Sequence, residues 1–456
     1  MLEEIGIPLP SEKALGLLDS AGCRADFDEG RVWIPESVIT KALSCAKSSH
    51  KIYDRSGERS LLFGGDNLLL TSGACQIRLK EYRGGYRDTT LADLERFTRL
   101  YDASDSIDII HTAVDATELG PKLLRTQMAA AVFKNTTKSC WFLASEPAVV
   151  EYLHRMGVAI RGSDKSLREK PFFRIATAPN SVLGFQREEI ESLMRCVELG
   201  IPTDCEHYPI MGLTAPLSVS GALAINNANF LCALAVKTAI DPENRSIFPV
   251  LAGSVNMKNA EIVTASPEIW QYYLAGIAMG RFYGLPTSVL VSTDSMDTEI
   301  QMTFEKATGH IISACAGADN IFDAVGALGA MNIASYEDVA IELEFLSALS
   351  HLLRDIVVLP ADQDFAIIKR ALESNMLFLE DHHTIQHYRD FLWSSELFTK
   401  ENFTAWQAGG SPSVVDRSNR IINKILDSHE VSELSRAVMD EIDAIVTEAG
   451  GRRIHD

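Results

Sequence analysis

Short apolar runs alternate with longer amphipathic stretches through the middle of the chain. Each run is bounded by Gly, Pro or polar clusters, as buried parallel strands are. Eight strands are expected, at residues 67–75, 108–114, 139–144, 172–178, 203–208, 247–252, 287–292 and 320–325. Helical periodicity predicts the intervening helices at residues 90–101, 121–135, 146–161, 187–199, 217–240 and 267–283, another starting near residue 298, and a last one from 335 to about 353. This count favours an α/β fold of the (β/α)8 TIM barrel type over a doubly wound sheet.

Several expected helices carry recognisable start signals. Thr90 and Ser335 are each followed three residues later by an aspartate, and Thr298 is followed by Gln301, so all three predict capping boxes. Pro121 stands at the first turn of its helix, where a missing N–H is harmless.

The chain divides into three expected parts. Residues 1–65 form an N-terminal helical segment that covers one end of the barrel, with helices at 11–21 and 35–46 around an extended stretch at 31–34. Residues 66–355 form the barrel. Residues 356–456 form a C-terminal helical extension packed on it, with helices at 365–376, 383–393, 418–428 and 432–448.

Composition narrows the class of protein. Hydrophobic residues at 46% and charged residues at 23% are globular values. No uninterrupted run of about 18 apolar residues predicts a membrane span, and the start MLEEIGIPLP lacks a signal sequence, so a cytoplasmic location is expected. A net charge of −20 argues against nucleic acid as a partner. The 8 cysteines form no CxxC motif, which predicts reduced, mostly buried thiols.

No GxGxxG, GxxxxGK[ST], HExxH or GxSxG motif occurs, so the residues at the carboxyl ends of the strands are the site candidates. Aromatic and acidic residues dominate this set and lysine is absent from it, which suits an organic cation better than a phosphate. The candidates are Arg174 and Asn180 from the fourth strand, Glu206, His207 and Tyr208 from the fifth, Ser292, Thr293 and Asp294 from the seventh, and Phe322 from the eighth.

Ordinary structural roles remain open for several of these positions. Trp141 and Phe142 are typical core residues of an apolar strand, and Asp294 can simply cap the next helix. Cys205 and His207 could supply two metal ligands, but no later strand end offers a clear third, so no metal is expected.

A resemblance extends over roughly residues 1–450. It is carried by GLTAPLSVSGALAINNANFL at 212–231, SPE at 266–268, YGLP at 283–286, TDSMDTEIQMTFEK at 293–306 and GADNIFDAVGALG at 317–329, a series similar to the trimethylamine methyltransferase family. The resemblance implies a (β/α)8 barrel that passes a methyl group from a methylamine to the Co(I) of a separate corrinoid protein. It also implies that no cofactor is bound directly, that the corrinoid (cobalamin) belongs to the partner, and that the chain is a homo-oligomer.

The family's pyrrolysine aligns with Val291 and Ser292, where this sequence has ordinary residues. The chain therefore resembles the non-pyrrolysine branch, whose members demethylate quaternary amines such as glycine betaine. A quaternary nitrogen is already fully charged and leaves as a neutral amine, so no general acid is needed. Ser292, Thr293 and Asp294 occupy the catalytic position of the family.

The resemblance also suggests roles for the remaining candidates. Glu206, Tyr208 and Phe322 would hold the trimethylammonium group, while Arg174, His207 or Asn180 would bind a betaine carboxylate. Two alternatives stay open: the same chemistry on carnitine, proline betaine or another methyl donor, and a non-catalytic subunit that docks a corrinoid protein.

Overall fold

Parallel strands form the centre of the computed structural model, which describes residues 1–451 except 66, 74, 180 and 323–324. They build two four-stranded sheets with the orders β12-β11-β10-β9 and β14-β17-β18-β6. The strands are β6 (Leu69–Leu70), β9 (Ile109–His111), β10 (Ser139–Leu143), β11 (Phe173–Thr177), β12 (Thr203–Cys205), β14 (Phe248–Val250), β17 (Thr287–Leu290) and β18 (Asn320–Phe322). Each lies within a run where the sequence predicts a strand, so all eight predicted strands are confirmed.

The two sheets approach each other at both pairs of edges. A parallel bridge between Thr71 and Ile109 connects the β6 edge to β9. At the other side β12 contacts β14, and Ile247 donates its N–H to Asp204 Oδ1 at 2.8 Å. No backbone ladder joins β12 to β14 within the described residues, so the fold is a mixed α/β fold and the closed barrel stays a prediction.

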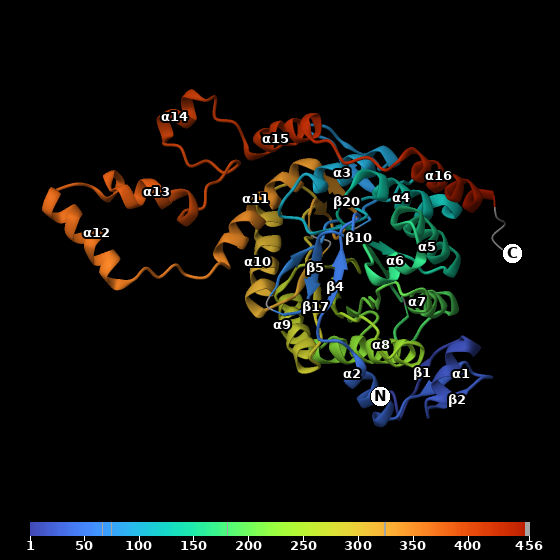
Figure 1. Cartoon of the computed structure of the whole chain (residues 1–456). Helices are drawn as coiled ribbons and strands as arrows, with labels where there is room; N and C mark the ends of the chain where they lie inside the picture. The colour runs from blue at the N-terminus through green and yellow to red at the C-terminus, as the bar shows by residue number, and fades with distance from the viewer. Residues whose placement is uncertain (66, 74, 180, 323–324, 452–456) are drawn as a thin grey trace.

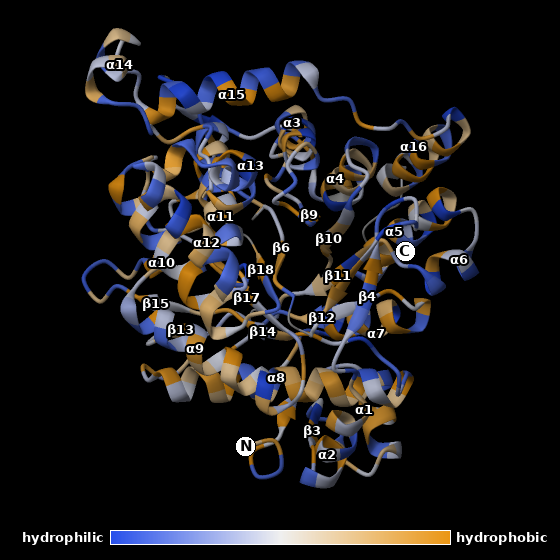
Figure 2. Cartoon of the chain, turned by 60° about the vertical axis from the view of Figure 1, so that its left-hand side comes forward, coloured by the Kyte–Doolittle hydropathy of each residue, from blue (hydrophilic) through white to orange (hydrophobic). Residues whose placement is uncertain are grey.

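Helices surround these strands, as Figures 1 and 2 show from two directions. Most of the buried apolar side chains lie in one continuous cluster that includes residues of the central strands and of the surrounding helices. The helices are α3 (Leu91–Asp102), α4 (Pro121–Asn135), α5 (Pro147–Arg161), α6 (Asp164–Glu169), α7 (Arg187–Leu199), α8 (Val219–Ile240), α9 (Pro267–Phe282), α10 (Ile300–Ala316) and α11 (Tyr336–Leu352). Among the described residues only α8 is long and apolar enough to cross a membrane, and most of it is buried, as in the core helix of a globular protein.

The helix starts follow the sequence signals with one exception. Thr90 and Asp93 form the reciprocal capping box of α3, and the Ser335 side chain caps α11 by accepting from the N–H of Asp338. The capping box predicted at Thr298 is wrong, because Asp297 Oδ1 accepts the Thr298 N–H at 2.6 Å and the helix begins only after Glu299.

The N-terminal residues hold more strand than the sequence predicts. Besides α1 (Glu12–Ser20) and α2 (Glu36–Cys45), they form the sheet β1-β3-β2 and the hairpin β4-β5. The strands are β1 (Ile7–Pro8), β2 (Arg24–Asp26), β3 (Arg31–Trp33), β4 (His50–Tyr53) and β5 (Ser60–Phe63).

The β4-β5 hairpin closes the amino end of the central strands. Tyr53 donates its N–H to the carbonyl of Pro171 at 2.8 Å, and Arg55 donates to Thr137 at 2.9 Å. Both acceptors stand just before a central strand, β11 or β10. The interior is therefore covered on this side, and the opposite end is left for a ligand to enter.

Two small sheets follow the central strands at their carboxyl ends. One has the order β13-β15-β16 and the other β19-β20-β7-β8. The strands are β7 (Arg78–Lys80), β8 (Tyr86–Asp88), β13 (Ile210–Met211), β15 (Gly253–Val255), β16 (Ile262–Val263), β19 (Ala327–Leu328) and β20 (Ile333–Ser335). Together they surround the carboxyl end where the candidate residues lie.

The C-terminal helices fall into two groups. α15 (Val414–Ser428) packs on α11 and α3, and α16 (Arg436–Gly451) packs on α4 and α5. By contrast α12 (Ala361–Ser374), the short η1 (Phe378–Glu380), α13 (His382–Phe391) and α14 (Phe403–Ala408) extend away from the body (Figure 1).

Candidate functional site

An aromatic layer lies at the carboxyl end of the central strands. Phe322, the last residue of β18, is buried with Leu251 and Leu290, and Tyr208 packs against this group. On its other side Phe322 stacks on Trp141 of β10, with ring centroids 5.5 Å apart and an angle of 8° between the planes. The structure thus brings together Tyr208 and Phe322, both predicted from sequence.

Gly253 makes room for the Tyr208 ring at the start of β15. A Cβ atom built on Gly253 would stand 3.0 Å from Tyr208 Cε1, closer than side chains normally pack. Glycine at this position therefore lets the Tyr208 ring approach the strand backbone.

Arg174 lies directly opposite Trp141 in the β10–β11 ladder. Its guanidinium carbon stands 4.2 Å from the centre of the Trp141 ring and 4.9 Å from that of Phe63, the end of the β4-β5 hairpin. Arg174 is fully buried and forms an ion pair with Asp204 of β12. The face of Trp141 thus already holds a cation supplied by the protein.

Glu206 follows Asp204 by two residues and therefore points to the same side of the chain. Burial raises the pKa of the Glu206 carboxyl to about 7, although Arg174 and a hydrogen bond from Trp141 oppose the shift. A carboxyl with this pKa changes charge close to neutral pH. An added cation would favour its ionised form.

Lys237 of α8 lies below this carboxyl, toward the amino end. Its Nζ donates to the backbone carbonyls of Thr203 and, at 2.9 Å, Arg245. Burial and the nearby Arg174 lower the pKa of Lys237 to about 7. Burial and neighbouring cations also hold the pKa of His50, in the hairpin, well below its usual value, so this imidazole is neutral.

The side chains of Cys205 and His207 point in different directions. Burial, with contributions from Cys232 and Glu189, raises the pKa of the Cys205 thiol well above its usual value. These neighbours belong to α8 and α7, so Cys205 faces the helices. His207 Nε2 lies 2.9 Å from the carbonyl of Ser181, and burial lowers its pKa, which keeps the ring neutral. Within the described residues no three His, Cys, Asp or Glu side chains are grouped closely enough to hold a metal ion.

The loop after β17 is fixed by a side chain that the sequence analysis missed. Glu305 Oε2, from α10, accepts the Thr293 hydroxyl at 2.5 Å and the Asp294 N–H at 2.9 Å. Ser292 is also buried, and its hydroxyl makes no hydrogen bond to any described residue. The three residues predicted as the catalytic position therefore stand in a rigid turn, and the Ser292 hydroxyl is the unbonded donor within it.

Asp294 holds the segment that leads into α9, the helix that precedes Asp294 in the chain. Its Oδ1 accepts the Thr264 N–H and the Thr264 hydroxyl, both at 2.8 Å, and Oδ2 accepts the Ala265 N–H at 3.3 Å. Burial raises the pKa of this carboxyl. Asp294 thus connects two loops at the carboxyl end and does not cap the helix that follows it. Asn180, the remaining predicted residue, lies outside the described residues.

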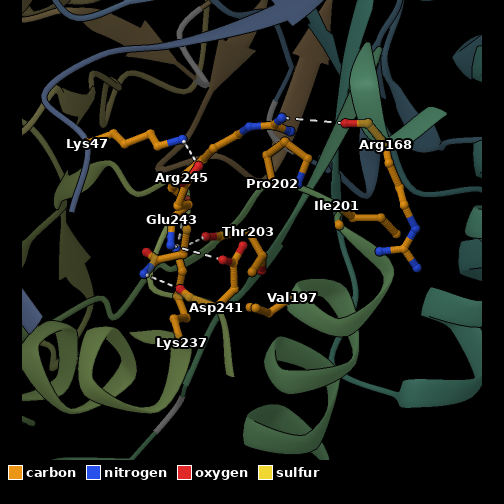
Figure 3. Close-up of a pocket in the computed structure, with 12 residues that line it drawn as sticks. Lys47, Arg168, Val197, Ile201, Pro202, Thr203, Lys237, Asp241, Glu243 and Arg245 are labelled. Carbon is orange, nitrogen blue, oxygen red and sulfur yellow. Dashed lines mark hydrogen bonds and ion pairs between the residues drawn. The ribbon is translucent and has the colours of Figure 1, made fainter. Parts of the chain in front are cut away.

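A cavity of about 280 Å³ lies at the opposite end, beside the starts of β12 and β14 (Figure 3). Lys47, Arg168, Lys237 and Arg245 line it, and the protein itself provides acceptors for them. Lys47 donates to Glu243 at 3.0 Å, and Arg245 donates to the Arg168 carbonyl at 3.5 Å. Because these cations are already engaged and carboxylates share the wall, the cavity does not replace the carboxyl-end layer as the candidate site.

Trp141, Asp204 and Glu305 contact the candidate residues, and sequence reasoning did not select them for the site. Trp141 has the spacing of an ordinary core residue in a strand, so nothing local distinguishes it. Asp204 offered a signal, since a charged residue inside a buried strand requires a partner. Glu305 offered none, because a glutamate one turn inside a helix is most often solvated.

Known proteins resemble the chain along almost its whole length. The sequence profile of the family described as trimethylamine methyltransferase (MTTB) matches residues 1–450. Trimethylamine methyltransferase MttB of Desulfitobacterium hafniense is 24% identical, over 98% of this chain and 90% of that protein. Glycine betaine methyltransferase of the same species is 22% identical over 99% and 94%, and the proline betaine:corrinoid methyltransferase of Eubacterium limosum 24% over 98% and 94%.

Proposed function

The chain belongs to the trimethylamine methyltransferase family. We propose that it is a member of the branch that lacks pyrrolysine and acts on a quaternary amine. It moves a methyl group from glycine betaine or a similar betaine to the Co(I) of a cognate corrinoid protein. The corrinoid belongs to that partner, and no cofactor is bound by this chain directly. The observation that carries the proposal is the buried Glu206 carboxyl beside Trp141, in one layer with Phe322 and Tyr208.

The layer suits a cation that carries its charge permanently. Aromatic faces attract a quaternary ammonium group, and the Glu206 carboxylate adds a negative charge without donating a proton. When a methyl group leaves, its C–N bond breaks and the electron pair stays on nitrogen. The methyl carbon bonds to cobalt, whose electron pair forms the new bond, and a neutral tertiary amine is released. No proton transfer is needed, and this chain's residues serve to bind the amine, exclude water and align one methyl group.

Arg174, His207 and Asn180 are the proposed partners of the substrate carboxylate. His207 lies in the loop that follows β12, but its neutral ring gives its one N–H to the Ser181 carbonyl, so binding a carboxylate would require the ring to turn or to take up a proton at Nδ1. Arg174 is already paired with Asp204, so its contribution is the positive charge beneath the layer.

Ser292, Thr293 and Asp294 are proposed to hold the reacting end of the substrate. Glu305 keeps Thr293 in place, and the unbonded Ser292 hydroxyl is available as a donor. These residues position the amine and take no part in proton transfer. No metal is assigned to the site.

The proposal includes a closed (β/α)8 barrel at residues 66–355, with an N-terminal segment at 1–65 and a helical extension at 356–456. The corrinoid protein approaches the carboxyl end, because the β4-β5 hairpin covers the other end. Neither nucleic acid nor a membrane is a proposed partner, the location is cytoplasmic, and the chain is a homo-oligomer.

Methylation of free Co(I) cobalamin, followed by its absorption spectrum, tests the proposal. Glycine betaine, proline betaine, carnitine, choline and trimethylamine are supplied in turn, without added zinc. A quaternary amine is expected to give methylcobalamin and the matching tertiary amine, whereas trimethylamine gives none. Turnover of trimethylamine alone contradicts the proposal. Corrinoid-protein binding with no turnover of any amine favours the non-catalytic docking subunit.

A further inference from the structure

A projecting arm carries exposed apolar residues at helical spacing. The arm consists of residues 355–392, with α12, η1 and α13, and Figure 1 shows it extending away from the body. On α12 the side chains of Phe365, Ile368 and Leu372 are 66%, 47% and 75% exposed. Their spacing of three and four residues places them on one face of the helix, where an amphipathic helix is expected to pack against a partner.

The second helix of the arm repeats this arrangement. Ile385 and Tyr388 on α13, with Leu392 directly after it, have the same spacing, and all three are exposed. The connector that leads into α12 adds Ile356, at 89% exposed, and Val358, at 83%. We call the six side chains on and directly after these two helices the stripe. So many large apolar residues on one segment mark a surface that is covered in the working protein.

The arm leaves α11 at its beginning and is bonded to α11 again at its far end, which holds it away from its own body. His351 Nε2 lies 3.2 Å from the carbonyl of Phe391, and Trp393 donates its indole N–H to Ser347 at 3.2 Å. Within the described part of the chain, the main element contact of α13 is with η1, inside the arm. Covering the stripe within one copy would require breaking these ties.

The body offers an apolar groove that its own arm leaves open. The groove has a volume of about 620 Å³ and lies between the start of α10 and α15. Ile300, at 88% exposed, and Phe304, at 60%, stand at its edge. The apolar side chains that line it are Ile300, Met302, Phe304, Ile341, Phe398 and Val414.

We propose that two copies of the chain form a dimer by exchanging arms, with the stripe of each copy lying in the groove of the other. One chain carries both an uncovered apolar stripe and an uncovered apolar groove, so a second copy supplies both missing partners at once. The exchange is reciprocal and closes on itself, which avoids open-ended assembly.

The stripe and the groove together are large enough for a stable pair. A standard interface buries about 800 Å² on each partner. The stripe alone, with side chains that are 44–75% exposed, stays below that area, but in a reciprocal exchange each chain also buries its groove, with Ile300 and Phe304, and the two surfaces together provide it. The exchange also has a place in the site, since α10 begins directly after the loop that carries Thr293 and Asp294. The partner's arm would border that loop.

Sedimentation velocity on the full chain at several concentrations tests the proposal. The wild type is expected to sediment at twice the monomer mass. Ile368→Glu on the stripe and Phe304→Glu in the groove are each expected to raise the dissociation constant at least tenfold. Gln363→Glu adds the same charge to α12 on the opposite face and is expected to leave the dimer intact. Circular dichroism and the melting temperature show that each variant is folded.

Mixing the two disruptive variants adds a sharper outcome. Ile368→Glu keeps an intact groove and Phe304→Glu keeps an intact arm, so the mixture is expected to recover dimers held by one contact. A monomeric wild type, or dimers that both substitutions leave unchanged, would overturn the proposal. So would a stripe that is covered only when a corrinoid protein is added. Dimers lost with Ile368→Glu but kept with Phe304→Glu would mean that the arms pair with each other, which also overturns it.

Discussion

Arg174 holds its guanidinium carbon 4.2 Å above the ring of Trp141, its neighbour across the β10–β11 ladder, and pairs with Asp204 on the other side. A buried charge of this kind is stable only with its partner present. We therefore expect Arg174→Met to lower the free energy of unfolding by about 3–5 kcal/mol. Arg174→Met combined with Asp204→Asn should recover much of this loss, since Asn keeps an acceptor for Ile247. Urea denaturation measures both, and an unchanged single variant would contradict the assignment.

The same double variant separates structure from binding at Arg174. It should remain folded while lacking the positive charge beneath the layer. A wild-type KM for betaine in this variant would remove Arg174 from the residues that bind the substrate carboxylate.

The charge state of the Glu206 carboxyl should determine how activity depends on pH. Its carboxyl has a pKa of about 7 and attracts a cation only when ionised. Activity measured as kcat/KM should therefore fall as pH decreases through 7, and Glu206→Gln should be less active and lose this dependence. Glu188→Gln, on the exposed side of α7, is the control and should keep the wild-type profile. A pH profile shared by Glu206→Gln and the wild type would exclude Glu206.

The sign for stability is opposite. The folded-state pKa of Glu206, about 7, lies above the ordinary glutamate pKa of 4.5, so between these two pH values the folded protein binds more protons than the unfolded chain. This group alone makes the protein less stable as pH rises from 4.5 to 7. Glu206→Gln should therefore lose less stability than the wild type over that range, as thermal unfolding at each pH would measure.

Tyr208 contributes a ring to the proposed cation layer. A cation–π contact in a desolvated site is worth about 1–2 kcal/mol, so Tyr208→Ala should raise KM by roughly tenfold. Tyr208→Phe keeps the ring and should stay within a few-fold of the wild type. Phe282→Ala, on the outer surface of α9, serves as a control for loss of an aromatic residue. Equal KM values in Tyr208→Ala and the wild type would place the cation elsewhere.

Thr293 is held by Glu305 through a buried hydrogen bond. Thr293→Val keeps the shape of the side chain but removes the hydroxyl, leaving the carboxylate one donor short. We expect kcat to fall by about tenfold, which corresponds to a net hydrogen-bond energy of about 1.4 kcal/mol, with little change in KM. Thr293→Ser restores the hydroxyl and should restore kcat. A rise in KM with unchanged kcat would instead assign this loop to substrate binding.

The fold could be predicted from sequence mainly because short buried runs and long amphipathic ones have different periods. The eight strands and the capping box at Thr90 followed from local pattern. The capping box predicted at Thr298 is wrong because the side chain of Asp297, one residue earlier, accepts the Thr298 N–H. The β4-β5 hairpin was missed because its strands depend on contacts with residues more than seventy positions away, such as Pro171 and Thr137.

The candidate site was predictable only in part. The pattern placed Tyr208 and Phe322 at strand ends, and the structure brings them into one apolar cluster, while their role in binding stays a prediction. What they contact depends on tertiary packing, so no local pattern indicates that Asp294 bonds to Thr264 or that Glu305 holds Thr293. A local pattern identifies which side chains share a face but not which distant group meets them.

The β4-β5 hairpin has a consequence for how the chain is assembled during synthesis. Its apolar residues Ile52 and Phe63 leave the ribosome early, yet the strands that bury them, including Trp141 and Ala176, are made much later. The hydrophobic side chains of the hairpin therefore stay exposed to water until these strands have been synthesised. Docking of the hairpin then closes long loops of the chain. Nascent chains halted before residue 176 should depend on chaperones, whereas longer ones should gain protease resistance at residues 50–63 in a single late step.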